Sequence, residues 1–201
     1  MSRPSLAPVR RAQILDAVEL CILEHGIESV SFSRVARVAG VRTSMVPHYF
    51  GTKGALMGAM VDRVLDRVQE LLDAAVDGAK GRVLIERLLG LLFGGAFVVP
   101  DLILVIDQLR ASAYFNETTR ERLVGMYRHF EQLAEGALAD AYPLAAPDRR
   151  RAVAYSLLCL SDANNSFRGV GFPADYDERA RVAAEVLLRG LEDEANGTTS
   201  S

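Results

Sequence analysis

The sequence has few of the residues that mark disulfide-rich, metal-binding or disordered proteins. Its two cysteines, Cys21 and Cys159, stand singly in apolar helical patterns, so we expect buried, reduced thiols rather than a disulfide framework or a zinc site. The three histidines have no spacing with other ligand residues that would hold a metal, and we expect no cofactor. With no tryptophan, only 7 prolines and half of its residues apolar, the composition is that of a globular protein.

Long apolar stretches are also scarce. The most apolar run has 12 uncharged residues, from Leu88 to Val99, before Pro100 and Asp101 interrupt it, whereas a membrane-spanning helix needs about 20. We therefore expect a buried helix here and no membrane partner. The chain opens without the pattern of a signal peptide, which predicts a cytoplasmic protein. Both ends are polar or rich in proline, glycine and serine, which predicts flexible tails at residues 1–8 and 193–201.

The alternating pattern of a half-buried strand is almost absent, and apolar residues recur with helical spacing instead. The expected fold class is all-α, with about nine helices. A three-helix helix-turn-helix domain should come first and a helical bundle should follow it. We expect the third helix at 43–50 and a long fourth helix ending at Gly78. Breaks in the pattern place the later helices at about 82–98, 101–114, 117–141, 148–169 and 175–192.

Charge is unevenly distributed, although the whole chain carries a formal net charge of only −3. Residues 1–60 hold seven Lys or Arg against four Asp or Glu, whereas the remainder holds 16 bases and 22 acids. This asymmetry indicates a positive N-terminal region that meets a polyanion and an acidic body that does not.

The stretch "SFSRVARVAGVRTSMVPHYF" has the features of a helix-turn-helix. Either Ser31 or Ser33 can cap its first helix. Ala36 is small where the two helices would cross, and Gly40 can adopt the left-handed conformation that the turn requires. Val46 would lie on the buried underside. Taken alone, these residues also fit an ordinary helical hairpin.

Residues 9–60 resemble the TetR family of bacterial transcription regulators. The matching features are an amphipathic helix ending at "EHG", the segment "SFSRVARVAGV", and "HYFGTKGALM" with its aromatic pair, Lys53 and Leu56. The resemblance implies a homodimer with an N-terminal DNA-binding domain, here 9–53. It also implies a domain at 54–192 that binds a small-molecule effector and dimerises.

In TetR-like proteins, the start of the third helix reads bases in the major groove, and residues around its end contact phosphates. Arg42 can donate two hydrogen bonds to guanine, although a phosphate contact alone is the alternative. The head of the second helix can also hold phosphate, because helix N-termini are electropositive. Phe50 is expected in the core. The expected DNA-binding residues are Ser31, Ser33, Arg34, Arg42, Thr43, Ser44, His48, Tyr49 and Lys53.

At Pro47 the sequence departs from the family pattern, which often has a phosphate-contacting tyrosine there. Proline cannot make that contact, so the protein must rely on its other phosphate-binding residues. Because proline is tolerated in the first turn of a helix, Pro47 predicts that the third helix begins late, with Thr43 or Ser44 as its cap.

Polar and aromatic side chains within apolar helices are the candidates for effector binding. Buried polar groups need partners, which are the effector, a second subunit or one another, and each aromatic is alternatively a core residue. A carboxylate among aromatics favours a cationic or aromatic effector. The segments "HYF" and "LSDANNSFRG" are similar to the choline-responsive repressors of the family, which does not identify the effector. The candidates are Phe93, Phe97, Asp107, Gln108, Tyr114, Tyr127, Asp162, Asn165 and Phe167, with Asn164 beside them.

These features predict a ligand-responsive repressor that binds a palindromic double-stranded DNA operator as a dimer and is released by its effector. The alternatives are a helical enzyme or small-molecule-binding protein with an incidental helix-turn-helix, and a protein-interaction module. We find no nucleophile, paired-carboxylate or metal arrangement that would make an enzyme. The last two long helices are the expected dimer interface, with candidate contacts at Leu157, Leu160, Val182, Val186 and Leu187.

Overall fold

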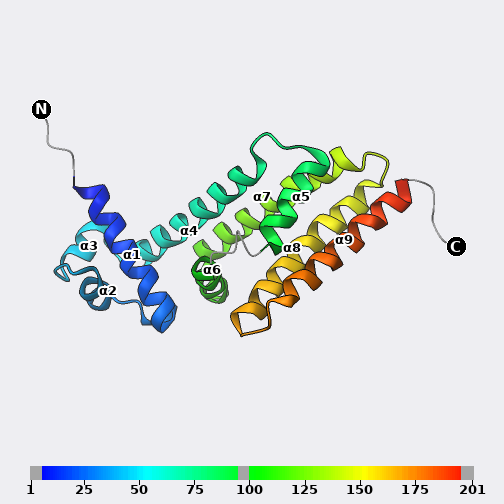
Figure 1. Cartoon of the computed structure of the whole chain (residues 1–201). Coiled ribbons are helices and arrows are strands. Elements are labelled where there is room, and N and C mark those ends of the chain that lie inside the picture. The colour runs from blue at the N-terminus through cyan, green and yellow to red at the C-terminus, as the bar shows by residue number, and fades with distance from the viewer. Residues whose placement is uncertain (1–5, 95–99, 196–201) are drawn as a thin grey trace, which may run out of the picture. The chain divides into compact units, whose positions relative to one another are not determined.

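The computed structural model describes residues 6–94 and 100–195, and within them the protein is all-α, as predicted. Nine α-helices and one short 3-10 helix, η1, form in these residues, and no strand does. The helices are α1 (Ala7–His25), η1 (Ile27–Ser29), α2 (Phe32–Ala39), α3 (Met45–Phe50), α4 (Lys53–Val76), α5 (Gly81–Phe93), α6 (Pro100–Ala113), α7 (Glu117–Ala141), α8 (Pro147–Gly169) and α9 (Asp175–Ala195) (Figure 1).

The chain forms two compact units, one at residues 1–67 and 104–123 and the other at 68–103 and 124–201. Helices α4, α6 and α7 each continue from one unit into the other. The expected functional division at residues 53 and 54 remains a prediction. Helix α1 already begins at Ala7 and α9 extends to Ala195, so both helices reach into segments that the sequence suggested as tails.

In the first unit, α1, α2 and α3 lie together (Figure 1). Gly26 ends α1 and Gly40 ends α2, both with positive φ, as the sequence indicated. Ile14, Val35 and Val46 are fully buried on α1, α2 and α3 respectively. Apolar burial therefore holds three helices of which two, α2 and α3, are too short to be stable alone.

Ion pairs join α4 to α1 within this unit. Arg63 Nη2 lies 2.5 Å from Asp16 Oδ1, and Arg67 Nη1 lies 2.6 Å from Glu19 Oε1. Glu19 is the most enclosed of these groups, with 13% of its side chain exposed. These two ion pairs therefore tie α4 to α1.

In the second unit, α8 and α9 lie side by side (Figure 1). Their core joins α5 and α7 through buried residues such as Leu89, Leu138, Ala154 and Leu191. The sequence placed the fifth helix at 82–98, but α5 ends at Phe93, because Gly94 leaves the helical conformation. The rest of that expected helix lies outside the described residues.

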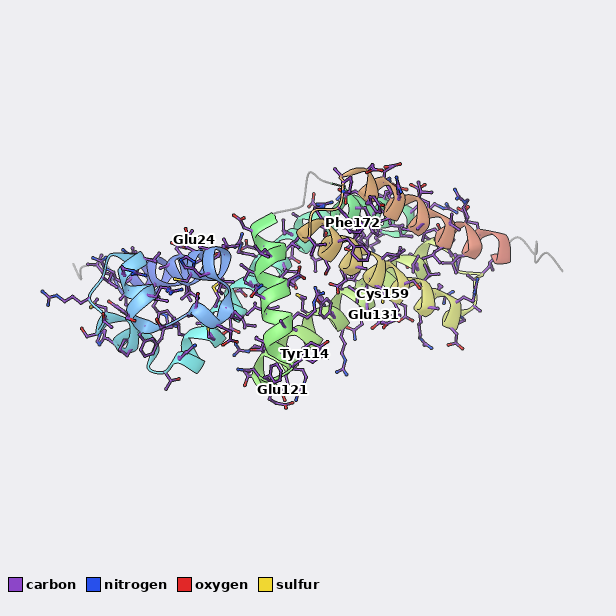
Figure 2. The ribbon with its side chains drawn as sticks, turned by 90° about the horizontal axis from the view of Figure 1, so that it is seen from below. Glu24, Tyr114, Glu121, Glu131, Cys159 and Phe172 are labelled. Carbon is purple, nitrogen blue, oxygen red and sulfur yellow. The ribbon has the colours of Figure 1, made fainter. Side chains whose placement is uncertain are left out.

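The expectation that both cysteines are buried is half wrong. Cys21 is buried on α1, and burial raises the pKa of its thiol, which keeps it protonated. Cys159 is exposed on α8 (Figure 2). Its apolar neighbours in the sequence belong to a helix that is apolar on two sides, and only one side packs in the core of the unit.

Candidate nucleic-acid interface

Arg42, Thr43 and Ser44 lie in the turn between α2 and α3, and all three are exposed. The third helix was expected from about residue 43, but α3 begins at Met45, so the predicted base-reading residues precede the helix. Ser44 is the N-cap residue, yet its side chain makes no capping hydrogen bond, so the expected side-chain cap is wrong.

Pro47 is the third residue of α3, in the first turn, as the sequence predicted. The first helical turn leaves backbone N–H groups without helical acceptors, so a missing N–H there costs little. Val46 N–H instead donates to the Thr43 carbonyl at 3.3 Å, and His48 N–H donates to the Ser44 carbonyl at 3.2 Å. The Pro47 carbonyl accepts from Gly51 N–H at 2.8 Å, so the proline still takes part in ending the helix.

The head of α2 is formed by Ser31, Ser33 and Arg34. Ser31 is the N-cap residue, and its hydroxyl accepts a hydrogen bond from Arg34 N–H at 3.3 Å. The Ser31 and Ser33 hydroxyl oxygens lie 3.3 Å apart, and both residues are exposed, whereas Arg34 is half-buried. Two hydroxyls and an electropositive helix end therefore share one exposed edge.

The remaining candidates lie at the end of α3 and the start of α4. The rings of His48 and Tyr49 pack edge to face with centroids 5.0 Å apart, and His48 is the more exposed of the two. Lys53 is the first residue of α4 and is exposed. Thr52 caps that helix, its Oγ1 accepting from Ala55 N–H at 3.1 Å. Sequence reasoning missed this Thr52 cap, although a threonine directly before a helical pattern is its usual signal.

Beneath these exposed groups, α3 is anchored by Val46, which is fully buried, and Phe50, which is 6% exposed. Phe50 thus lies in the core, as expected. Arg11 of α1 places its guanidinium carbon 4.3 Å from the centroid of the Phe50 ring and donates to the Tyr49 carbonyl. Sequence reasoning counted Arg11 as one of the N-terminal bases but assigned it no role.

The effector candidates divide between the two units. In the first, Asp107 pairs with Arg110 at 3.1 Å, and Gln108 Oε1 accepts from Ile27 N–H at 3.3 Å. Tyr114, at the end of α6, is 79% exposed and lies at the surface of the unit (Figure 2). Phe97 lies outside the described residues.

In the second unit, Tyr127 O–H and Asp162 Oδ1 lie 3.3 Å apart, which joins α7 to α8. Asn165 donates to the Ser161 hydroxyl at 3.5 Å. Phe93 is buried in the core and Phe167 is half exposed, stacked on Phe172 at 5.0 Å. A hydrogen bond thus brings the candidates Tyr127 and Asp162 together.

The described residues contain no group of three or more His, Cys, Asp or Glu side chains placed to hold a metal ion. Within the same part of the chain, no helix has both the length and the apolar character needed to cross a membrane.

Comparison with known proteins agrees with the family resemblance of the N-terminal sequence. The family model described as "Bacterial regulatory proteins, tetR family" matches residues 14–60, which include α2, α3 and the start of α4. The HTH-type transcriptional regulator BetI of Agrobacterium fabrum is 28% identical over 163 residues, which cover 81% of this chain and 78% of the relative. The BetI regulator of Paraburkholderia phymatum is 39% identical over 59 residues, only 29% of this chain and 30% of that relative.

A solved structure of a transcriptional regulator from Pseudomonas aeruginosa PAO1 matches with a TM-score of 0.78 at 22% identity, covering 94% of this chain and 92% of that one. This likeness shows that the fold is shared. The curated relatives are transcription regulators and not enzymes. The exposed turn and helix on a buried base lie within residues 14–60, which match the DNA-binding domain of the TetR family, and the chain is a DNA-binding transcriptional regulator similar to members of that family.

Proposed function

We propose that the protein is a cytoplasmic, dimeric repressor that binds a palindromic operator and leaves it when a small-molecule effector binds. The observation that carries the proposal is the turn before α3, where Arg42, Thr43 and Ser44 are all exposed directly beside a helix anchored by buried Val46. Exposed donors on a rigid base are what direct base reading requires.

Within this interface the side chains have different roles. Arg42, Thr43, Ser44 and His48 are proposed to face base edges, with Arg42 bidentate to a guanine. The phosphates are proposed to be held by Ser31, Ser33 and Arg34 at the head of α2, and by Tyr49 and Lys53 around the end of α3.

The dimer is proposed to form through α8 and α9. An open groove of about 730 Å³ runs along these two helices, and none of its lining residues is charged. Two of its lining residues, Val186 and Tyr155, are each more than half exposed in one chain. Burying such apolar surface is the main favourable term in association. The groove is lined by Tyr155, Ser156, Cys159, Leu160, Ala163, Ala183, Val186 and Leu187.

This surface refines the contacts suggested from the sequence. Leu160, Val186 and Leu187 line the groove, and Val182 is 45% exposed nearby on α9. Leu157 does not belong to it, because its side chain is 4% exposed and packs in the core of its own unit. Helical phase alone could not distinguish these two sides of α8.

The effector is proposed to bind among α5, α7 and α8. A small apolar cavity there is lined by residues of all three helices, among them Leu88, Phe130 and Leu157. Its volume is about 10 Å³, room for about one water molecule, so an effector must push the helices apart. Tyr127 lies one turn before Phe130 on α7, and its hydrogen-bond partner Asp162 supplies a carboxylate. An aromatic ligand with a cationic group fits this combination.

Effector binding is proposed to reach the DNA-binding residues through α4 and α6. The Arg63 and Arg67 ion pairs join α4 to α1, and the Gln108 hydrogen bond joins α6 to the turn that follows α1. A ligand that favours a different tilt of these helices would shift the population away from the DNA-binding state.

Gel-shift titrations with fragments of the genomic region around the gene test the repressor proposal. At moderate salt, one fragment should bind much more tightly than the others, and the effector should release it. Equal binding of every fragment would contradict operator recognition. Suitable first effector probes are choline-like quaternary amines and neutral aromatics. Only the quaternary amines carry the cation that Asp162 would hold.

A substitution tests the role of Arg42. In Arg42→Ala, base preference should relax at one position of each half-site, with a loss of about 1–3 kcal/mol at the preferred guanine. Binding measured against a set of single-base operator variants reports this directly. A uniform loss across all sequences would assign Arg42 to phosphate instead.

A further inference from the structure

Helix α3 has six residues, Met45–Phe50, and depends on tertiary contacts for its orientation. The last carbonyl groups of a helix have no partners within it. Two of those in α3 are satisfied locally, since Gly51 N–H donates to the Pro47 carbonyl at 2.8 Å and Thr52 N–H donates to the Phe50 carbonyl at 2.9 Å. The carbonyl of Tyr49 takes its donor from a different helix.

That donor is Arg11 of α1. Its Nη1 lies 2.5 Å from the Tyr49 carbonyl oxygen, and its guanidinium carbon lies 4.3 Å from the centroid of the Phe50 ring. One planar group therefore bonds the backbone of α3 and stacks on the side chain that anchors it. Its positive charge also lies at the negative end of the α3 dipole.

Two residues further along α1, Gln13 makes the corresponding contact to α2. Gln13 Nε2 donates to the Ala39 carbonyl at 2.7 Å, and Ala39 is the last residue of α2. Arg10 Nη1 donates to Gln13 Oε1 at 2.7 Å, which fixes the direction of the amide. One turn of α1 thus holds the C-terminal ends of both helices of the helix-turn-helix.

We infer that Arg11 and Gln13 are positioning residues for DNA recognition: together they set the angle between α2 and α3 and so the placement of the turn at residues 40–44. That turn carries Arg42 and its exposed neighbours and lies between the two helices. Base reading depends on placement to within a fraction of an ångström, whereas attraction to phosphates depends mainly on charge. Loss of the two contacts therefore lowers discrimination between DNA sequences.

Arg11 is exposed, so a direct phosphate contact is the competing role. The two roles are distinguished by measuring affinity for a selected operator and for unrelated DNA over a range of salt concentrations. In Arg11→Ala and Gln13→Ala, operator affinity should fall about tenfold more than affinity for unrelated DNA. Gln13→Ala is informative by itself, because it leaves the charge of the domain unchanged and should leave the salt slope unchanged.

Arg37→Ala is the matched control, since it removes one exposed charge from α2. It should weaken binding to both DNAs by a similar factor. Thermal unfolding identifies any variant that fails to fold, and Arg11→Lys then replaces Arg11→Ala: it keeps the charge but loses the planar stacking on Phe50, and should lose part of the discrimination.

Parallel losses for operator and unrelated DNA in Arg11→Ala, with wild-type behaviour of Gln13→Ala and Arg11→Lys, would overturn the inference and assign Arg11 to phosphate. Absence of any preferred sequence for the wild-type protein would instead contradict the operator proposal.

Discussion

Pro47 is an uncommon residue in a helix that presents side chains to DNA, and its position in the first turn of α3 explains why it is tolerated. The helix loses no backbone hydrogen bond at this position, because the Thr43 carbonyl accepts from Val46 N–H and the Ser44 carbonyl accepts from His48 N–H. Proline has no hydroxyl to offer a phosphate, so this position cannot make the phosphate contact that the family resemblance implies.

Pro47→Tyr should therefore strengthen DNA binding by restoring a phosphate contact at this position, by about 0.5–1.5 kcal/mol. The measurement is operator affinity by fluorescence anisotropy. Pro47→Ala is the control, because it restores the backbone N–H without a hydroxyl. Equal affinities for the tyrosine and alanine variants would mean that the missing contact does not limit binding.

Single residues differed in how far the sequence could predict them. The predicted local roles are confirmed for Gly26, Gly40 and Ser31. Each of these residues ends or caps a helix through its own backbone or through a residue close to it in the sequence. Arg11 and Cys159 depend on which distant helix lies beside them. The Arg11 contact crosses 38 residues of chain, and no local pattern encodes it.

At the scale of elements, helix bounds could be predicted well where sharp breaks flank the helix. Helix α7 spans 117–141 as predicted, and α8 and α9 begin within one residue of expectation. Prediction failed for α5, where apolar residues continue past Gly94 although the backbone leaves the helix. Apolar periodicity reports which residues can be buried, but it does not report where a glycine interrupts the backbone.

A polar cluster joins α8 to α9 near the turn between them. Asn164 Nδ2 donates to Asp177 Oδ1 at 2.7 Å, and Arg168 pairs with the other carboxylate oxygen. Burial pushes the pKa of Asp177 upward, but the hydrogen bonds from Arg168 and Asn164 and the charge of Arg168 outweigh it and hold the pKa below its ordinary value of 3.8. The ionised carboxylate is therefore favoured in the folded protein.

Because the folded pKa of Asp177 is depressed, its contribution to stability is present above the unfolded pKa and is lost as pH falls through the folded pKa. Asp177→Asn should lower the free energy of unfolding by about 1–3 kcal/mol at neutral pH. It should also make the decline in stability below about pH 4 shallower. Chemical denaturation across this range measures both effects.

Asp175→Asn is the matched control for that series. Asp175 also pairs with an arginine, Arg179, but its side chain is 57% exposed, so the pair is largely screened by solvent. The control should change stability by less than about 1 kcal/mol. An Asp177→Asn variant with wild-type stability and an unchanged acid profile would mean that the cluster does not stabilise the crossing of α8 and α9.

At the scale of the whole molecule, the groove along α8 and α9 determines the proposed assembly. A twofold dimer presents two copies of α3 to successive major grooves, and half-sites about 34–36 Å apart follow from that symmetry. The sequence indicated these two helices as the interface, but the groove itself required the structure, because packing in the core uses the other side of α8.

Val186→Glu should dissociate the proposed dimer, because it buries a charge in an apolar interface. Val186 is 53% exposed in one chain, so the folded monomer should tolerate the change. Sedimentation equilibrium measures the oligomeric state. Val83→Glu, at a residue 59% exposed on α5, is the control and should remain dimeric. A Val186→Glu protein that stays dimeric would place the interface elsewhere.

We propose that this chain reads a DNA sequence through the exposed turn before α3. Selection of binding sites from a pool of random duplex DNA by the wild-type protein tests this proposal. The expected product is an inverted repeat with half-sites about 10–10.5 base pairs apart. Selection with Arg42→Ala should lose the preferred base at one position of each half-site. A pool that remains random after repeated rounds of selection would contradict the claim.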